Sequence, residues 1–539
     1  MKYRLLTILS FLLPLFTFAQ ETAKKGLDEK VNDAFMPFAT WWEGFVLTTV
    51  PVGEYNIPIV LILLVLGATF FTIYFKFPNI LKFPLAINVV RGKYDDLEGH
   101  GVEKAELNIV DGDIPDTIRD ESEDGEVSHF QALATAVSGT VGLGNIAGVA
   151  VAIAIGGPGA TFWMIVCGLI GMSTKFVECT LGVKYRDVGE DGTVYGGPMY
   201  YLSRGLKAKG LSGLGKVLAA IFAILCVGAS FGGGNAFQSN QAAVQLKTMF
   251  NLEGGAIGVI IGIVLAVLVG IVIIGGIKKI ASVTEKIVPF MAIIYVIASL
   301  IIIFANIKYI GDAFGMIFSG AFTPEAGLGG ILGVIIVGFQ RAAFSNEAGA
   351  GSAAIAHSAV KTKYPASEGI VALLEPFIDT VVICTMTALV IIFFNMDVGA
   401  FSYGNAVWST VLLNDSGAYT GGVDLTSMAY DSVIPGFRYV LTIAIVLFAF
   451  STMISWSYYG LQSWKYLFGR GRTADIIYKV LFLLFVVIGA AATLDAVIKF
   501  SDAMILALVF PNMIGLLILF PKVKEELKKY LDAIKKAYA

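Results

Sequence analysis

Apolar residues along the chain fall in eleven runs of about twenty residues, separated by polar connections. A run of this length crosses the hydrocarbon core of a membrane as a helix. Lipid offers no partner to backbone groups outside helices and closed barrels, so the pattern predicts an all-α polytopic membrane protein. The expected helices span approximately residues 57–75, 130–156, 160–182, 217–248, 256–276, 284–304, 331–358, 368–394, 436–460, 475–492 and 502–520.

Two of these expected helices are interrupted by glycine. The first interruption, Gly139–Asn145, reads GTVGLGN, and the second, Phe344–Gly351, reads FSNEAGAG. Each glycine costs a helix about 1 kcal/mol relative to alanine. A break at membrane depth survives only where protein, water, an ion or a substrate takes up the freed backbone groups. Two such breaks in the two halves of a membrane chain indicate a secondary transporter whose binding site lies between them.

The two ends of the chain carry patterns of their own. Residues 1–19 join two basic residues to an apolar run too short to span comfortably, which predicts a cleaved signal peptide, with an uncleaved anchor as the alternative. Residues 20–56 then form a periplasmic N-terminal segment, whose apolar spacing predicts an amphipathic helix in the outer interface. The tail, 521–539, places apolar residues between lysines and predicts a basic amphipathic helix on the cytoplasmic leaflet.

The distribution of positive charge sets the expected orientation. The connections expected inside hold 27 of the 38 Lys and Arg residues and those expected outside hold five, which agrees with a mature N-terminus outside and a C-terminus inside. We therefore expect a multi-pass protein of a bacterial cytoplasmic (inner) membrane. The acidic stretch 94–128 is expected to be a solvated cytoplasmic insertion. The outer connection 395–435, which lacks Lys and Arg, is expected to fold over the outer mouth.

Composition narrows the function classes further. The chain is 56% hydrophobic and 15% charged, with a mean hydropathy of +0.78. It shows no basic face for nucleic acid and no sign of an obligate protein partner. The four cysteines form no CxxC pair and read as small core residues, and the three histidines form no HExxH motif. Paired catalytic motifs and the GxxxxGK[ST] nucleotide loop are also missing, so an enzyme or an ATP-driven pump is not expected.

Five motifs in order along the chain resemble a known family. They are GTVGLGNIAGVA at Gly139–Ala150, YGGPMYYL at Tyr195–Leu202, FGGGNAFQSNQ at Phe231–Gln241, FSNEAGAG at Phe344–Gly351 and SWSYYG at Ser455–Gly460. Over residues 57–520 the chain resembles the alanine or glycine:cation symporter family, the sodium/alanine symporters of the amino acid-polyamine-cation superfamily. The resemblance implies a leucine-transporter-like 5+5 inverted repeat after one extra N-terminal helix. The repeats then cover roughly 130–304 and 331–520.

Candidate substrate contacts gather at the two breaks. Amide N–H groups at the start of the half-helix after the first break suit a substrate carboxylate, and glycine allows close approach; tight helix packing is the alternative. Residues of the second break supply an apolar wall, a hydroxyl and an amide near the substrate ammonium. Two amides one helical turn apart share a helix face, unless they only bridge helices. The expected substrate-binding residues are Gly142, Gly144, Asn145, Asn235, Gln238, Phe344, Ser345, Asn346 and Trp456.

A sodium site is expected beside the first break. Sodium prefers several hard oxygen ligands, which half-helix carbonyls and hydroxyls provide without a fixed charge. By resemblance to the superfamily's sodium site, the ligands are the carbonyls of Ser138, Val141 and Phe448 and the hydroxyls of Ser451 and Thr452. The alternative is that these hydroxyls bond back to their own helix.

The function expected from these features is a symporter that couples sodium to the uptake of small neutral amino acids, alanine or glycine, by alternating access. The bulk of Phe344 and Trp456 favours a small substrate. Arg341 and Glu347 lie at membrane depth and are expected to pair with each other or with a gate. One alternative is a proton-coupled carrier, which would use an intramembrane carboxylate such as Glu178, Glu347, Glu375 or Asp379. The other is a transporter-derived amino-acid sensor.

Overall fold

The computed structural model describes residues 26–52, 55–98, 126–189, 193–323, 330–404, 406–407 and 409–538. The expected signal peptide and residues 99–125 of the acidic insertion lie outside these ranges. Within them, seven helices are long and apolar enough to span a membrane, one bent pair adds an eighth span, and three shorter apolar helices complete the set. These correspond one to one with the eleven expected spans, so the all-α polytopic class is confirmed.

Each span consists of one helix or of consecutive helical pieces. In chain order, with the pieces of one span grouped together, these are α3 (Ile59–Tyr74); α7 (His129–Thr140), the π-helix η2 (Gly144–Gly148) and α8 (Val149–Gly156); α9 (Gly159–Lys184); α12 (Ser212–Phe231), the π-helix η4 (Gly232–Ala236) and α13 (Phe237–Phe250); α14 (Ile257–Ile273); α15 (Gly276–Ala305); α17 (Gly330–Asn346) and α18 (Ala353–His357); α19 (Pro365–Val371), α20 (Leu374–Pro376), the π-helix η6 (Phe377–Cys384) and α21 (Thr385–Val398); α23 (Phe437–Phe468); α24 (Arg472–Ala491); and α25 (Leu494–Ala507) with α26 (Val509–Tyr538).

Short elements connect the spans. The helices among them are α2 (Leu27–Val46), α4 (Pro78–Leu81), α5 (Phe83–Val90), α6 (Asp95–Glu98), α10 (Pro198–Tyr200), the π-helix η3 (Tyr201–Gly205), α11 (Leu206–Ala208), the 3₁₀-helix η5 (Ile307–Tyr309), α16 (Ile310–Phe322) and α22 (Gly422–Val433). The strands form three small antiparallel sheets, β1 (Thr49–Val52) with β2 (Tyr55–Pro58), β3 (Asp187–Val188) with β4 (Val194–Tyr195), and β5 (Ala406–Val407), β6 (Thr410–Leu412) and β7 (Tyr419–Gly421) in that order.

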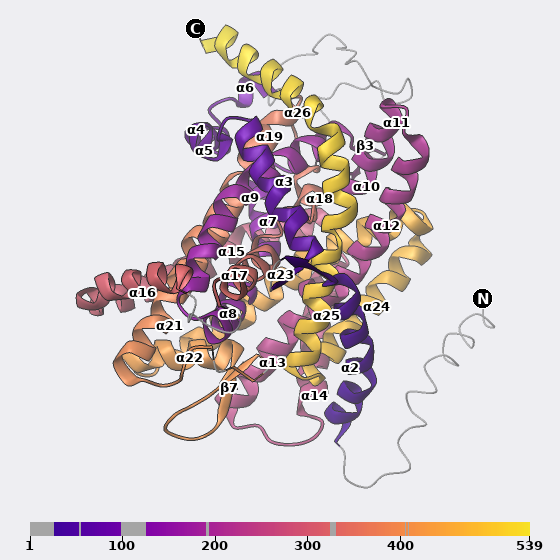
Figure 1. Ribbon diagram of the computed structural model, residues 1–539. Coiled ribbons are helices and arrows are strands. Elements are labelled where there is room, and N and C mark those ends of the chain that lie inside the picture. The colour runs from indigo at the N-terminus through magenta and orange to yellow at the C-terminus, as the bar shows by residue number, and fades with distance from the viewer. Residues whose placement is uncertain are drawn as a thin grey trace, which may run out of the picture.

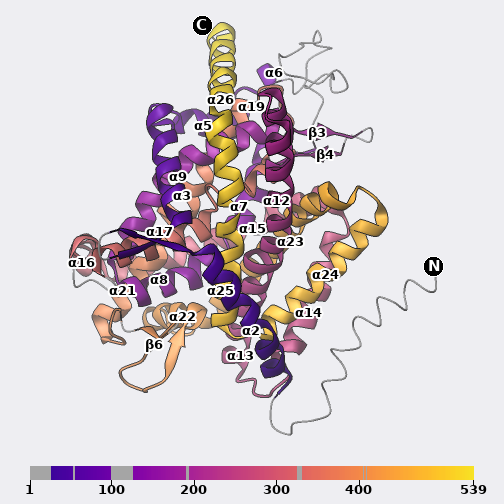
Figure 2. The ribbon, with the colours of Figure 1, turned by 45° about the vertical axis from the view of Figure 1, so that its right-hand side comes forward.

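The connections alternate between two ends of the helix bundle. α6, β3 and the C-terminal end of α26 lie at one end, and α2, α13 and α22 reach the opposite end (Figures 1 and 2). The first end carries the loops in which Lys and Arg concentrate, so we call it the basic end. This arrangement agrees with the alternation expected from the sequence.

The tail and the acidic stretch differ from expectation at the basic end. α26 runs unbroken to Tyr538, and its apolar face packs against protein: Val523 and Tyr530 are fully buried. Tyr530 Oη donates to Glu98 Oε1 at 2.5 Å, and Glu98 is only 1% exposed. The expectation of a solvated acidic stretch is therefore wrong at Glu98. A carboxylate this deep requires partners, and a histidine supplies one.

The connection 395–435 folds back onto the first broken span. α22 and the three-stranded sheet pack against η2 and α8. Thr426 Oγ1 donates to the carbonyl of Ile146 at 3.1 Å, and the Val423 N–H donates to Gln241 Oε1 at 3.0 Å. This connection therefore covers the first break from the end opposite the basic end.

Candidate functional site

The first broken span bends by 49° between α7 and the helix that begins at Gly144. Two amides freed by the break are bonded to side chains: the Gly142 N–H donates to Asn145 Oδ1 at 2.9 Å, and the Leu143 N–H donates to Gln238 Oε1 at 3.0 Å. The sequence predicts amides that face the substrate, whereas in this structure neutral amide oxygens hold these two. Asn145 and Gln238 thus meet at the same break.

The second break begins later than the sequence predicts. α17 continues through Asn346, so Phe344, Ser345 and Asn346 are helical, and the chain leaves the helix at Glu347. Glu347 has a φ of 55°, and Gly349 and Gly351 have φ values of 93° and 82°. A non-glycine residue in the left-handed region costs about 1–2 kcal/mol, and such conformations concentrate at functional sites.

Asp379, on η6, joins the two breaks. Asn145 Nδ2 donates to Asp379 Oδ1 at 2.6 Å and to the Asp379 carbonyl at 3.0 Å. From the second break, Ser345 Oγ donates to Asp379 Oδ2 at 2.8 Å, and Asn346 Nδ2 donates to the neighbouring Thr380 Oγ1 at 2.9 Å. Sequence reasoning singled out Asp379 only as a carrier for proton coupling. Its signal was a carboxylate at membrane depth, which is rare enough to demand a function.

Aromatic rings fill the space between the breaks against glycine backbone. The Phe344 ring lies over the first break, since a Cβ added at Gly144 would be 3.4 Å from Phe344 Cδ1. The ring also meets Phe237 edge to face, with centroids 5.2 Å apart. Trp456 packs on Gly234 so closely that a Cβ there would overlap the indole. The glycines of η4 therefore let these two rings approach the centre.

The expected sodium ligands gather where α23 passes the first break. Thr452 Oγ1 donates to the Ser138 carbonyl at 2.9 Å, and Ser138 Oγ donates to the Ser451 carbonyl at 2.8 Å. Ser451 Oγ donates to the Phe448 carbonyl of its own helix at 3.0 Å, which is the alternative that the sequence left open for these hydroxyls. Val141 is the last residue before Gly142, where an added Cβ would overlap Thr452 Oγ1. The set is buried, neutral and rich in oxygen, which suits a monovalent cation.

One substrate-binding candidate points away from the breaks. Asn235 Nδ2 donates to the Phe482 carbonyl on α24 at 2.7 Å, so its amide bridges two helices here, the alternative that the sequence left open. Gln238, in contrast, donates to the Gly233 carbonyl at 2.8 Å and reaches the first break. Arg341 forms an ion pair with Asp502 on α25 and not with Glu347, so the first of the two pairings that the sequence left open, Arg341 with Glu347, is not formed.

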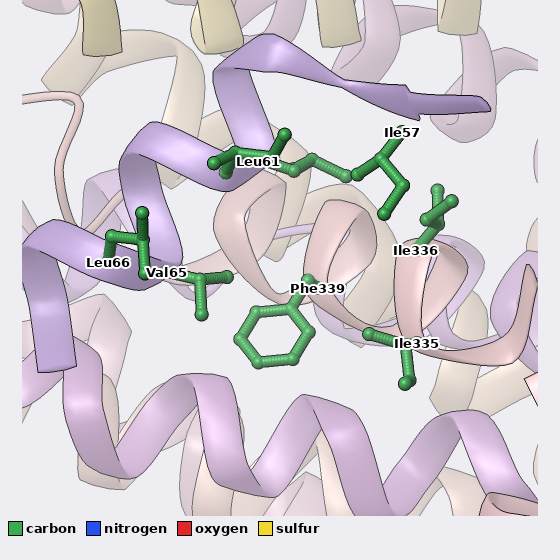
Figure 3. Close-up of a pocket in the computed structure, with 8 residues that line it drawn as sticks. Ile57, Leu61, Val65, Leu66, Ile335, Ile336 and Phe339 are labelled. Atoms are coloured by element: carbon green, nitrogen blue, oxygen red, sulfur yellow. The ribbon is translucent and has the colours of Figure 1, made fainter. Parts of the chain in front are cut away.

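A cavity of about 220 Å³ lies apart from this site, between α3 and α17 (Figure 3). Its eight lining side chains are all apolar, among them Leu61, Val65, Ile335 and Phe339. A zwitterion needs polar partners when it leaves water, so this cavity does not suit an amino acid.

Comparisons with known proteins identify related sequences. The sequence matches the model of the family described as sodium:alanine symporter over residues 46–539. It is 42% identical over 413 residues to the sodium/alanine symporter AgcS of Methanococcus maripaludis, covering 76% of this chain and 86% of that protein. It is 33% identical over 418 residues to the sodium/proton-dependent alanine carrier protein of Bacillus sp. (strain PS3), covering 77% and 90%.

Among solved structures, MhsT in complex with L-phenylalanine is similar with a TM-score of 0.49 and 16% sequence identity, covering 74% of this chain and 100% of that one. A likeness of this strength adds nothing about the site.

Proposed function

The chain belongs to the sodium:alanine symporter family, and on this premise we propose that it couples sodium influx to the uptake of alanine or glycine. The observation that carries the proposal is the meeting of two broken helices beside a buried cluster of neutral oxygens on α23. Broken helices supply half-helix ends for an amino acid and carbonyls for a cation in one place. The amino acid and sodium are both transported, and neither is a resident cofactor.

The sodium ligands we propose are the carbonyls of Ser138, Val141 and Phe448 with the hydroxyls of Ser451 and Thr452. These groups carry no net charge, which favours a monovalent ion over a divalent one. The hydroxyl of Thr452 already spans the gap between α23 and the Ser138 carbonyl at 2.9 Å. Sodium bound here would tie α7 to α23, so its binding would stabilise one arrangement of the first broken helix.

The substrate carboxylate is assigned to the amides of Gly142, Leu143 and Gly144. Asn145 Oδ1 and Gln238 Oε1 now accept from the first two of these amides, and an amide oxygen offers the same acceptor as a carboxylate oxygen. These two side chains thus stand in for the substrate carboxylate. The substrate displaces them, and the positive end of the half-helix dipole favours the negative charge.

The substrate ammonium is assigned to the second break, near the Ser345 hydroxyl, the Asn346 amide and the carbonyls freed beyond them. Phe344 and Trp456 form the walls, and both are at most 4% exposed. Their bulk leaves room for a methyl group or a hydrogen rather than a long side chain, hence alanine or glycine. Asp379 bonds to both breaks and keeps the two halves of the pocket in register.

The two ways out of this pocket have different chemistry. Toward the basic end, Ser455 Oγ and Tyr459 Oη on α23 are buried and have no hydrogen-bond partner among the described residues. They lie one helical turn apart and supply polar groups to an exit route. Toward the opposite end, one turn from Phe344, the Arg341–Asp502 ion pair closes the path. We assign the basic end to the cytoplasm by the positive-inside rule.

The ion gradient supplies enough free energy for accumulation. One sodium moved with a zwitterion carries one net charge, for which 100 mV provides about 2.3 kcal/mol. A tenfold sodium gradient adds about 1.4 kcal/mol. Together these support concentration by roughly several hundredfold without ATP.

Radiolabelled alanine uptake into proteoliposomes tests the proposal. An inward sodium gradient is compared with a matched potassium gradient and with a proton gradient at clamped voltage. We expect accumulation with sodium and none with potassium. Alanine binding without accumulation under any gradient would identify a sensor, and accumulation with protons alone would identify a proton-coupled carrier.

A further inference from the structure

A chain of buried ionisable side chains runs from the basic end to the second break, and the proposed symport does not use it. In spatial order its members are Glu98, His129, Glu368, His357, Glu375 and Lys175, on six different helices; none is more than 4% exposed. We call this set the ionisable chain. So many buried ionisable groups are costly unless each is paired.

Contacts link each member of the ionisable chain to the next, at hydrogen-bond distance except between His357 and Glu375, whose facing atoms form an ion pair without a hydrogen bond. His129 Nε2 lies 2.5 Å from Glu98 Oε2, and His129 Nδ1 contacts Glu368 Oε2. The other oxygen of Glu368 lies 2.5 Å from His357 Nδ1, and His357 Nε2 lies 3.5 Å from Glu375 Oε2. Glu375 Oε1 accepts from Lys175 Nζ at 3.0 Å. Each histidine therefore uses its two ring nitrogens to join two carboxylates.

The charges of the ionisable chain cancel, but two neighbouring carboxyls have no positive charge to compensate them. Fully ionised, its three acids and three bases cancel. Lys175 also faces Glu178 and Glu347, which are 0% and 2% exposed, and neither forms an ion pair within the described residues. Two surplus negative charges at this depth would cost several kcal/mol each. These carboxyls must therefore bind a proton or a cation.

The groups around the two carboxyls are hydrogen-bond donors. Glu347 Oε1 accepts from Trp456 Nε1 at 3.0 Å, and Glu347 Oε2 accepts from Ser352 Oγ. Glu178 Oε1 accepts from the Gly349 N–H at 2.9 Å and from Asn512 Nδ2 at 2.7 Å. Glu178 Oε2, fully buried, has no hydrogen-bond partner among the described residues. A metal cation needs additional acceptor oxygens, whereas a proton needs only a carboxylate oxygen.

We propose that Glu178 and Glu347 form a proton-binding site at the second break, supplied from the basic end along the ionisable chain, and that its protonation is linked to transport. The link runs through Glu347, which holds the left-handed turn of the break and bonds to Trp456, a wall of the proposed pocket. Protonation neutralises the buried charge and lets the helices anchored at the second break move relative to one another. Deprotonation leaves a surplus negative charge that holds Lys175 in place. This movement is then arrested.

The proton moves without any change of oxidation state. A proton from water at the basic end binds Glu98, and each histidine accepts a proton at one ring nitrogen and releases one from the other. Lys175 releases a proton to Glu178 or Glu347 and regains one from the Glu375 side, so one new O–H bond forms at the break. The other titratable groups that face the two carboxyls are Glu375, Tyr201, Tyr459, Cys179 and Cys226.

Infrared spectroscopy of the purified full-length protein in lipid tests the site independently of transport. We expect a carboxylic-acid C=O stretching band at about neutral pH that disappears as the pH rises, because a buried carboxyl then loses its proton. Glu347→Gln and Glu178→Gln should each remove part of this band. Glu525→Gln, on the exposed face of α26, serves as the matched control and should leave the band unchanged. A band that is absent from the wild type, or unchanged in both variants, would overturn the proposal.

Alanine exchange at equal, saturating sodium on both sides of the membrane tests the linkage, and this part rests on the proposed function. The wild-type exchange rate should fall by roughly tenfold per pH unit above the titration midpoint. Glu347→Gln mimics the protonated form of the carboxyl that carries the link and should hold the rate within about twofold across that range, whereas Glu178→Gln keeps Glu347 and should retain a fall with pH at a shifted midpoint. Two variants that keep the wild-type profile would overturn the linkage. No exchange at any pH would contradict the proposed function, while the infrared band still decides the proton site.

Discussion

The two broken helices meet at one centre but are built from different chemistry. The first break relies on glycine, a π-helical turn and neutral amides, with Asn145 and Gln238 holding its freed N–H groups. The second break relies on left-handed residues and on the carboxyls of Glu347 and Glu178. Neutral caps can be exchanged for a ligand at little cost, whereas buried charges need compensation. We therefore assign binding mainly to the first break and proton-dependent control to the second.

The same contrast appears in the backbone. The first break bends the span by 49°, yet the chain regains helical hydrogen bonding at Gly144 through the π-helix. The second break takes six residues between Asn346 and Ala353 and three positive φ angles to turn the chain. π-Helical turns occur often at functional sites. The difference indicates that the first break is suited to rearrangement and the second to anchoring.

Removing the group that joins the two breaks should have the largest effect. Asp379→Ala deletes the acceptor of both Asn145 and Ser345, and we expect sodium-driven alanine uptake to fall about 100-fold, because small displacements of binding groups have effects of that size. Asp379→Asn should retain part of the activity, since its amide oxygen still accepts one bond. Asp397→Asn, at the exposed end of α21, is the control. Uptake within about twofold of wild type in Asp379→Ala would show that the breaks act independently.

Two glycines in the first break allow the effect of steric crowding at the cation site to be distinguished from the effect of helix propensity. A Cβ at Gly142 would overlap Thr452 Oγ1 and lie 3.0 Å from Gln238 Oε1, whereas a Cβ at Gly148 has no atom within 4 Å. Gly142→Ala should lower uptake at limiting sodium by about tenfold, or about 1.4 kcal/mol. Gly148→Ala should leave uptake unchanged and gain up to about 1 kcal/mol in stability. Equal sodium dependence in the two variants would remove the first break from the cation site.

In the second break, a corresponding change should affect stability more than sodium affinity. At Gly351, with φ of 82°, an added Cβ would lie 2.8 Å from both Asn512 Nδ2 and Pro198 Cγ. We expect Gly351→Ala to destabilise the protein by about 1–2 kcal/mol, the cost of the left-handed conformation, in thermal unfolding of the purified protein. Gly311→Ala, on α16 with open space around it, is the control. A large shift in sodium affinity without loss of stability would contradict the anchoring role.

A surface cluster away from both breaks, Asp187 with Arg204 and Arg470, shows how small the effect of a change outside the site should be. Burial raises the pKa of Asp187, but hydrogen bonds and ion pairs with Arg470 and Arg204 outweigh it and hold the pKa below its ordinary value. A lowered folded-state pKa stabilises the protein above the unfolded pKa, near pH 4, and this stabilisation is lost as the pH falls through the folded value. Asp187→Asn should therefore cost at most about 1 kcal/mol at neutral pH.

Thermal unfolding at neutral pH and along a series of falling acid pH values checks this prediction, since the difference from wild type should shrink as the pH falls from the unfolded-state pKa through the folded-state pKa of Asp187. Uptake should not change. Altered sodium dependence in Asp187→Asn would mean that the breaks are not the only places that set coupling.

Local sequence patterns were sufficient to predict the helices and the first break. Apolar runs mark the spans because the requirement of lipid for apolar, internally bonded segments acts on every residue of a run. The gathering of Ser138 with Ser451 and Thr452 was predicted through the family resemblance, since their contact joins residues 313 and 314 positions apart. The roles of all the site residues in binding remain predictions.

Other features had no local signal. The bonds of Asp379 to Asn145 and Ser345 span 234 and 34 positions. Glu98 lies within an acidic stretch, and only the fold brings His129 and Tyr530 to it. The direction of individual side chains could not be predicted either, because a shift of one residue rotates a helical side chain by about 100 degrees. Asn235 bonds to α24, whereas Gln238 bonds to the first break.

Reciprocal binding of sodium and alanine tests the central claim most directly. Sodium and substrate that share the first broken helix must raise each other's affinity by the same factor. The affinity of the purified protein for alanine should be at least about tenfold higher in sodium than in potassium, and Thr452→Ala should abolish most of this difference while Thr452→Ser keeps it. Equal affinity for alanine in sodium and in potassium would contradict a coupled site at the two breaks.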